Sequence, residues 1–223
     1  LRRMLRFFYL AGLTPDTPFS SEDIEHIKSQ TTKEAPIPTK EDVEAVLNAI
    51  DVTWKEAMVR LAAETGMRIS EVLALSWGDL DRNIIYVQTS AVDKKVNLTK
   101  TQSSTRKIQL SSRLVAQLAE IKLSKGQAID LDFIFTNENG RLFASSEALL
   151  AVLKPAIRRA GVKPFAWRGL RRFYINELLD QNIMLNHVQK LVGHELGSNV
   201  TEKHYRRVKQ QDVLKDEYVI SLG

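Results

Sequence analysis

Apolar side chains recur every three to four positions along most of this chain, which predicts a mainly α-helical protein. Such spacing places apolar residues on one face of a helix, where they can pack against a core. Proline and glycine mark several of the predicted helix ends. The predicted helices cover residues 1–12, 40–50, 54–65, 69–75, 113–123, 147–160, 170–179, 183–192, 203–208 and 212–222.

Several of these helices have recognisable capping residues. Thr39 and Asp42 stand three apart before an apolar run, as in a capping box with Asp in place of Glu. Gly66 follows a predicted helix at the position where a left-handed C-cap is easiest. Gly78 is expected to close the helix that begins near residue 69.

The predicted helix 147–160 has its own signals. Ser145 or Ser146 can supply its N-cap, because a hydroxyl can accept a bond from a free N–H of the first turn. Pro155 is expected to kink the helix, since proline lacks the N–H that the helix needs. Gly161 is expected to end it.

A β region interrupts the helices between residues 84 and 110. Residues 84–87 read Ile-Ile-Tyr-Val, a β-branched and aromatic run that is typical of a strand. Residues 95–100 and 106–110 are candidate partner strands, with Gln-Ser-Ser turn residues between them. The predicted fold is therefore mainly α with a small antiparallel β-sheet.

The charge distribution favours a partner that presents phosphate groups. The net charge is +5, and more than half of the 32 Lys and Arg residues fall in three stretches without acidic side chains. These stretches are 94–113, 154–172 and 203–209. They are typical of a surface that follows nucleic-acid phosphates, although three ordinary solvated faces are the alternative.

Composition also narrows the chemistry. The chain has no Cys, which excludes disulfides, thiolate metal sites and a cysteine nucleophile. The four His residues lack zinc-type spacing, so we expect no metal and no other cofactor. No apolar run approaches the ~20 residues that a membrane helix needs. Because the sequence begins with Leu, we expect a fragment or a processed form.

Four separated segments contain residues suited to cleaving a phosphodiester without a metal. This reaction needs an in-line nucleophile, positive charge around phosphorus and an acid for the leaving oxygen. Arginine suits the second task, because its planar fork gives two parallel donors to phosphate oxygens. The segments are Thr65-Gly-Met-Arg68-Ile-Ser-Glu71, Arg168-Gly-Leu-Arg171, Gly193-His194 and Thr201-Glu-Lys-His-Tyr205-Arg-Arg207.

The arginines also have ordinary structural interpretations. Arg68 can be a surface residue at the start of a helix, where Glu71 three positions later can orient it. Arg168 and Arg171 are three apart, so we expect them on one helical face, opposite the apolar positions. A basic surface edge would have the same pattern.

The tyrosines divide into two groups. Tyr174 and Tyr218 lie in apolar periodic patterns and are expected to pack in a core. Tyr205 lies among the basic residues of 203–209. A free phenol has a pKa of ~10, so surrounding positive charge is what a tyrosine nucleophile needs.

As an ordered set, these segments resemble the tyrosine recombinase (phage integrase) family, which cuts and rejoins DNA through a phosphotyrosine bond. The first segment continues as Val-Leu-Ala-Leu and then Trp77-Gly-Asp-Leu-Asp81, similar to the family's first-arginine box. Gly193-His194 resembles its Leu-Gly-His box. The gap of eleven residues to Tyr205 is longer than we expect, and residues 195–200 could hold the insertion. The resemblance spans roughly residues 38–210.

The resemblance implies a role for each site residue. Tyr205 would be the nucleophile, and a lysine of the β region, Lys100, would protonate the leaving 5′ oxygen, with Lys94 and Lys95 as nearby alternatives. The phosphorane charge would be held by Arg68, Arg168, Arg171 and His194.

One position departs from the family pattern. Arg168 stands where the family usually has His. A guanidinium can stabilise charge but cannot accept a proton near neutral pH. The general base is therefore left open, and water or another group would take the phenol proton.

The resemblance also implies the organisation of the chain and its partners. Double-stranded DNA would be the substrate, bound by a homotetramer on paired sites, with no membrane or small-molecule partner and a nucleoid-associated, cytoplasmic location. The tail helix would dock on a neighbouring protomer or pack on its own domain. The expected parts are 1–20, the last helix of a truncated core-binding domain; 21–38, a linker; 39–210, the catalytic domain; and 211–223, the tail.

The implied function is that of a site-specific DNA recombinase or integrase. Two alternatives remain at this stage. One is a type IB topoisomerase-like enzyme, which would use the same chemistry on a single duplex. The other is a non-catalytic DNA-binding protein with the same basic surface.

Overall fold

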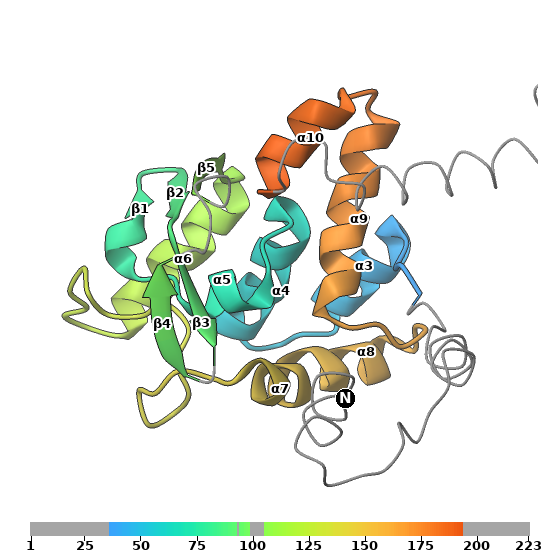
Figure 1. Ribbon diagram of the computed structural model, residues 1–223. Helices are drawn as coiled ribbons and strands as arrows, with labels where there is room; N and C mark the ends of the chain where they lie inside the picture. Colours follow the sequence, from blue (N-terminus) through green and yellow to red (C-terminus); the bar gives the residue numbers. More distant parts are fainter. Residues whose placement is uncertain (1–35, 93, 99–104, 194–223) are drawn as a thin grey trace, which may run out of the picture. The chain divides into compact units, whose positions relative to one another are not determined.

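Helices dominate the computed structural model, which describes residues 36–92, 94–98 and 105–193 (Figure 1). The predictions for residues 1–12, 203–208 and 212–222 lie outside these ranges. The elements are α3 (Lys40–Asn48), α4 (Thr53–Thr65), α5 (Ile69–Leu73), the 3₁₀ turn η1 (Trp77–Asp79), β1 (Leu80–Asp81), β2 (Ile84–Val87), β3 (Thr89–Val92), β4 (Lys95–Leu98), β5 (Arg106–Gln109), α6 (Ser112–Ser124), α7 (Ser145–Ala148), the π-helical turn η3 (Leu149–Leu153), α8 (Lys154–Ala160), α9 (Trp167–Asp180) and α10 (Leu185–Val192). The prediction of a mainly α fold with a small antiparallel β component is confirmed.

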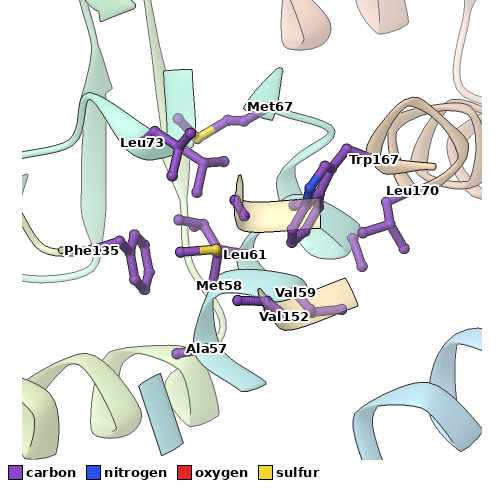
Figure 2. Close-up of a cluster of buried hydrophobic side chains, with 14 of the residues drawn as sticks. Ala57, Met58, Val59, Leu61, Met67, Leu73, Phe135, Val152, Trp167 and Leu170 are labelled. Atoms are coloured by element: carbon purple, nitrogen blue, oxygen red, sulfur yellow. The ribbon is translucent and has the colours of Figure 1, made fainter. Parts of the chain in front are cut away.

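The central helix of this part of the chain is α4, which packs against α6 and α9. Its side chains from Ala57 to Ala63 are all buried, including those that face away from α9. A helix that is buried all round has to lie in the middle of a core. Figure 2 shows the cluster around it, in which Met58 and Leu61 lie among apolar side chains of later elements, such as Phe135, Trp167 and Leu170.

Two predicted caps are confirmed. The Thr39 hydroxyl accepts from the N–H of Asp42 at 3.2 Å, and the Asp42 carboxylate accepts from the N–H of Thr39 at 3.1 Å. This reciprocal pair satisfies two N–H groups that the first turn of α3 leaves free. Gly66 ends α4 in the left-handed region, with φ +61°.

The prediction that Gly78 closes the next helix is wrong. Helix α5 ends at Leu73, and the Leu75 carbonyl beyond it accepts from the N–H of Ile134 at 2.9 Å. Gly78 lies instead in η1, where an added Cβ would be 3.1 Å from the Asp130 carbonyl oxygen. Glycine therefore lets the backbone approach residue 130 closely there.

The β prediction is correct for one pair of strands and wrong for the other. Strand β5 pairs antiparallel with β2, and Ile108 lies opposite Ile85. Strand β4 pairs with β3, which the sequence did not predict, in a separate two-stranded sheet. All four residues of β4 are exposed, whereas Ile108 of β5 is buried. Strand β5 thus places a buried apolar side chain beside β2, whereas Val96 and Leu98 of β4 stay exposed.

The helical segment 145–160 differs from its prediction at its start. Ala144, and not either serine, is the N-cap, and its N–H donates to the Glu147 carboxylate at 2.9 Å. Before Pro155 the helix widens into the π-helical turn η3, since proline cannot donate to the preceding turn. Gly161 ends the helix with φ +69°, as predicted.

Candidate functional site

Arg68 is positioned by the start of a short helix and by one carboxylate. It is the N-cap of α5, two residues after the left-handed turn at Gly66. Its Nη1 donates to Oε1 of Glu71 at 2.7 Å, and its backbone N–H donates to Oε2 at 2.9 Å. The prediction that Glu71 orients Arg68 is confirmed. The Arg68 side chain is 40% exposed, so an incoming group can reach it.

Arg171 lies on α9 and is only 7% exposed. Its Nη1 donates to the Gly66 carbonyl and its Nη2 to the Val192 carbonyl, each at 2.7 Å. Both carbonyls are at helix C-termini, those of α4 and α10. The negative end of a helix dipole favours a cation, so this position stabilises a guanidinium that has lost most of its water.

The two arginines meet at the end of α10. Nη2 of Arg68 donates to the Gly193 carbonyl at 3.2 Å, one residue after the Val192 carbonyl that Arg171 holds. In Figure 1 the C-terminal end of α10 lies close to the end of α4. Three of the four sequence segments are thus brought together at the position directly before His194. The predicted site residues Lys100, His194 and Tyr205 lie outside the described residues.

Arg168 lies in a different environment. It is the second residue of α9 and is exposed, and it forms no hydrogen bond or ion pair with another described residue. The prediction that both arginines lie on one face opposite the apolar positions is wrong for Arg171, which is buried next to Leu170. The backbone carbonyls at residues 66 and 192 compensate for that burial, because they accept hydrogen bonds from the Arg171 guanidinium in place of water.

The sequence analysis missed one member of this cluster, Arg106 on β5. Its side chain is 6% exposed, and its Nη2 donates to Oε2 of Glu71 at 2.8 Å. Glu71 itself is only 2% exposed. Buried carboxylates are rare unless they are paired with cations. If the burial of Glu71 had been predicted, a second cation besides Arg68 would also have been expected. The local sequence did not indicate that burial.

The charges of the cluster shift two pKa values. Burial alone would raise the pKa of Glu71, but the hydrogen bond and charge of Arg106 and the hydrogen bonds of Arg68 outweigh it and lower that pKa. Burial, and then the charge of Arg68, lower the pKa of Arg171 to about 9. Both groups are therefore ionised at neutral pH. Three guanidiniums face one carboxylate, and the excess positive charge favours an anion at this site.

Arg68 and Arg171 each retain donors for such an anion. Arginine has five N–H donors, and Arg171 uses two of its own on the Gly66 and Val192 carbonyls. Arg68 likewise uses one side-chain bond on Glu71 and one on Gly193. The bonds to backbone and carboxylate thus hold the two planes in place without using up their donors.

Gly66 is a further determinant of this geometry, and Gly66→Ala should disturb it. An added Cβ would lie 2.4 Å from Cδ1 of Tyr174, and φ at this residue is +61°. Tyr174 is half-buried, in line with its predicted core position, and burial raises its pKa. We expect a loss of roughly 2–4 kcal/mol in the free energy of unfolding, from the left-handed backbone and the steric overlap together.

Denaturant unfolding monitored by circular dichroism measures this loss. Gly161→Ala is the matched control, because Gly161 has a similar φ of +69° but no atom within 4 Å of an added Cβ. It should cost only the backbone part, about 1 kcal/mol. Equal losses for the two variants would show that Tyr174 does not constrain Gly66.

The comparison with known proteins identifies the class of this fold and site. Residues 37–212 match the sequence model of the phage integrase family. This chain belongs to that family, and the family resemblance seen in the sequence is confirmed.

Individual relatives agree with this assignment. The chain is 27% identical over 194 residues to a XerC-like tyrosine recombinase of Caldanaerobacter subterraneus, covering 75% of this chain and 49% of the relative. It is 26% identical over 203 residues to tyrosine recombinase XerD of Listeria monocytogenes, covering 85% and 66%. An integrase of Streptomyces ambofaciens is 32% identical over 188 residues, covering 74% and 47%. The chain thus spans about half to two thirds of the length of these relatives.

Solved structures share the fold. The Tn1549 transposon integrase in complex with circular intermediate DNA aligns with a TM-score of 0.72 at 18% identity, over 95% of this chain and 77% of that one. The XerA recombinase aligns with a TM-score of 0.63 at 18% identity, over 84% and 66%. The described residues contain no helix long and apolar enough to cross a membrane.

Proposed function

We propose that this chain is the catalytic part of a site-specific DNA recombinase or integrase. In this proposal the phenol oxygen of Tyr205 attacks the scissile phosphorus in line. A 3′-phosphotyrosine bond forms, the bond from phosphorus to the 5′ oxygen breaks, and that oxygen leaves as a 5′-hydroxyl. The 5′-hydroxyl of a partner strand then attacks the phosphotyrosine and releases the tyrosine. The strand is rejoined without a nucleotide cofactor, because the covalent bond conserves the energy of the phosphodiester.

The proposal rests above all on the convergence of Arg68 and Arg171 at the Val192 and Gly193 carbonyls. These two guanidiniums come from elements more than 100 residues apart, and the residue after Gly193 is the histidine of the family pattern. Preorganised cations around a forming phosphorane are usually the largest single contribution to such a reaction. Membership in the phage integrase family supports the same chemistry.

The roles of the other site residues are part of the proposal. His194 donates to a non-bridging phosphate oxygen, and Lys100 protonates the leaving 5′ oxygen. Arg168, exposed at the start of α9, adds positive charge where DNA approaches but cannot serve as the general base. A water molecule or another group takes the phenol proton.

The substrate and assembly are proposed from the same relationships. Double-stranded DNA is the substrate, as the DNA-bound integrase of the same fold suggests. A homotetramer on paired sites carries out strand exchange at the nucleoid, in the cytoplasm. Residues 39–210 form the catalytic domain and 211–223 a tail helix. Residues 21–38 are a linker from the last helix, 1–20, of a core-binding domain.

A nicked suicide duplex tests the proposal directly. Cleavage close to a nick lets the short 5′-hydroxyl fragment diffuse away, so that any covalent protein–DNA adduct accumulates. We expect wild-type protein to form an adduct that survives denaturing electrophoresis, and Tyr205→Phe to form none. Because the free chain can bind DNA weakly, the assay also includes a longer form of the protein with a complete core-binding domain.

The controls separate this function from its alternatives. Tyr174→Phe removes only the hydroxyl of a half-buried tyrosine and keeps the ring that packs on Gly66, so it should leave the adduct yield within about twofold. Absence of an adduct from the wild-type protein would indicate a DNA-binding protein without catalysis. Adduct formation with relaxation of one duplex, but no exchange between two marked duplexes, would indicate a topoisomerase-like enzyme.

A further inference from the structure

One carboxylate in the site bridges two guanidiniums that come from different elements. Oε1 of Glu71 accepts from Nη1 of Arg68 at 2.7 Å, and Oε2 accepts from Nη2 of Arg106 at 2.8 Å. Oε2 also accepts the backbone N–H of Arg68 at 2.9 Å. Arg106 is 6% exposed, whereas Arg68 is 40% exposed. Arg68 is therefore the more exposed end of this bridge.

We propose that Arg106 is a positioning residue for Arg68, acting through the Glu71 carboxylate, in the strand cleavage proposed above. Arg106 holds Glu71 in one orientation from the side of β5. Glu71 in turn holds the guanidinium of Arg68 where it meets the scissile phosphate. The inference rests on the proposed function and adds to it a residue that acts through Glu71 and does not itself bind the phosphate.

The burial of Glu71 explains why a second cation is needed. A carboxylate that is 2% exposed has lost its water, and an ion pair with one partly exposed arginine compensates for that loss only in part. Arg106 supplies a second charged donor from within the protein. Oε1 then accepts from Arg68, and Oε2 accepts from both Arg68 and Arg106, so that three hydrogen bonds fix the orientation of the carboxylate.

The same arrangement preserves positive charge for the substrate. With Arg68 alone, the charge of Glu71 would be balanced by the guanidinium that has to bind the phosphate. Arg106 neutralises part of the Glu71 charge, so Arg68 keeps more of its electrostatic attraction for an anion. Orientation matters as well, because a misplacement of about 1 Å in such a site can reduce a rate roughly 100-fold.

A double-mutant cycle tests the proposal. Arg106→Met, Glu71→Gln and the double variant are compared by single-turnover cleavage of the nicked duplex at saturating DNA, well below their unfolding temperatures. We expect Arg106→Met to lower the cleavage rate by about 30–100-fold, while the Kd for uncleaved duplex stays within about threefold. In the Glu71→Gln background the same change should cost less than about threefold, because coupled residues are not additive.

Two further variants distinguish positioning from a general loss of structure. Arg106→Lys keeps the charge and should recover part of the lost rate, at least about fivefold, although lysine lacks the planar fork. Arg60→Met is the matched control, since Arg60 is 9% exposed and pairs with Glu56 and Glu64 at 2.6 and 3.2 Å, all within α4. It should lower the unfolding temperature as Arg106→Met does, but change the cleavage rate by less than about threefold.

The outcomes separate this inference from the proposed function. If Arg106→Met slows cleavage no more than Arg60→Met, or equally in both Glu71 backgrounds, the positioning role is wrong. If the wild-type protein forms no adduct, the proposed function fails, and side-chain NMR of ¹⁵N-arginine decides the inference. The Nη–H signals that Arg68→Lys removes should then broaden in Arg106→Met; unchanged signals would overturn the positioning role.

Discussion

Arg171→Met should reduce the rate of DNA strand cleavage by about 10²–10³-fold, the usual effect of removing one preorganised donor from a developing negative charge. The loss has two origins. In the proposed mechanism the reaction loses a direct donor to the phosphorane, and the protein loses the 2.7 Å hydrogen bonds from Arg171 to the carbonyls of Gly66 and Val192. Methionine keeps most of the buried apolar stem, so the change is confined to the charged end.

The effect of this substitution on stability should be much smaller than its effect on cleavage. Burial lowers the pKa of Arg171 to about 9, so the folded protein already disfavours this charge. Removing the guanidinium removes the cost of burying its charge, which partly offsets the cost of leaving two carbonyls unsatisfied. We expect a net loss of about 1–2 kcal/mol in the free energy of unfolding. Single-turnover cleavage and denaturant unfolding of the same preparation measure the two quantities.

Arg171→Lys and Arg60→Met complete the experiment. Lysine keeps a positive charge but lacks the fork that reaches two carbonyls at once, so cleavage should still fall at least about tenfold. Arg60→Met removes an equally buried guanidinium from α4 and should leave the cleavage rate almost unchanged. If the free energy of unfolding and the cleavage rate fall in proportion to one another in all three variants, Arg171 acts only in folding.

Lys100→Ala should also slow cleavage by about 10²–10³-fold, as expected for the loss of a general acid. The size of the loss depends on the leaving group. Replacing the bridging 5′ oxygen by sulfur should restore the rate of the variant to within about tenfold of wild type, because a thiolate leaves without protonation. Single-turnover cleavage of matched oxygen and sulfur substrates measures the rescue.

The neighbouring lysines provide the comparison for this test. Nζ of Lys94 is already 2.8 Å from the Glu147 carboxylate, and Lys95 lies on the exposed strand β4. Neither Lys94→Ala nor Lys95→Ala should show a loss that sulfur rescues. A sulfur-rescued loss at either position, and none at Lys100, would transfer the role of general acid to that lysine.

Local features of the fold were predictable because their causes lie within a few residues. The capping box follows from the side chains of Thr39 and Asp42, which lie in one turn. The left-handed helix ends at Gly66 and Gly161 follow from the conformational freedom of glycine at those positions. The helices 54–65 and 113–123 were predicted to within one residue for the same reason. The pairing of β4 was not predicted, since no strand was expected at residues 89–92, where β3 pairs with it.

The site residues also divide into those whose arrangement has a local cause and those whose arrangement depends on distant parts of the chain. The family and the residues of its boxes were recognised from ordered motifs, and the orientation of Arg68 by Glu71 follows from their spacing on one short helix. The burial of Arg171 and the presence of Arg106 were not predicted. Both depend on what neighbouring elements place around a side chain, and arginine at a helical or strand position is exposed far more often than it is buried.

By itself, then, the sequence determined the helical class, the family and the arginines of the family pattern, because each is written in short, ordered segments. The tertiary structure alone decided which atoms those arginines hold. Arg171 bonds to a carbonyl 105 residues away, and Arg68 to one 125 residues away. Hydrogen bonds between such distant groups form only after α4, α9 and α10 have packed together. No stretch of local sequence contains both partners.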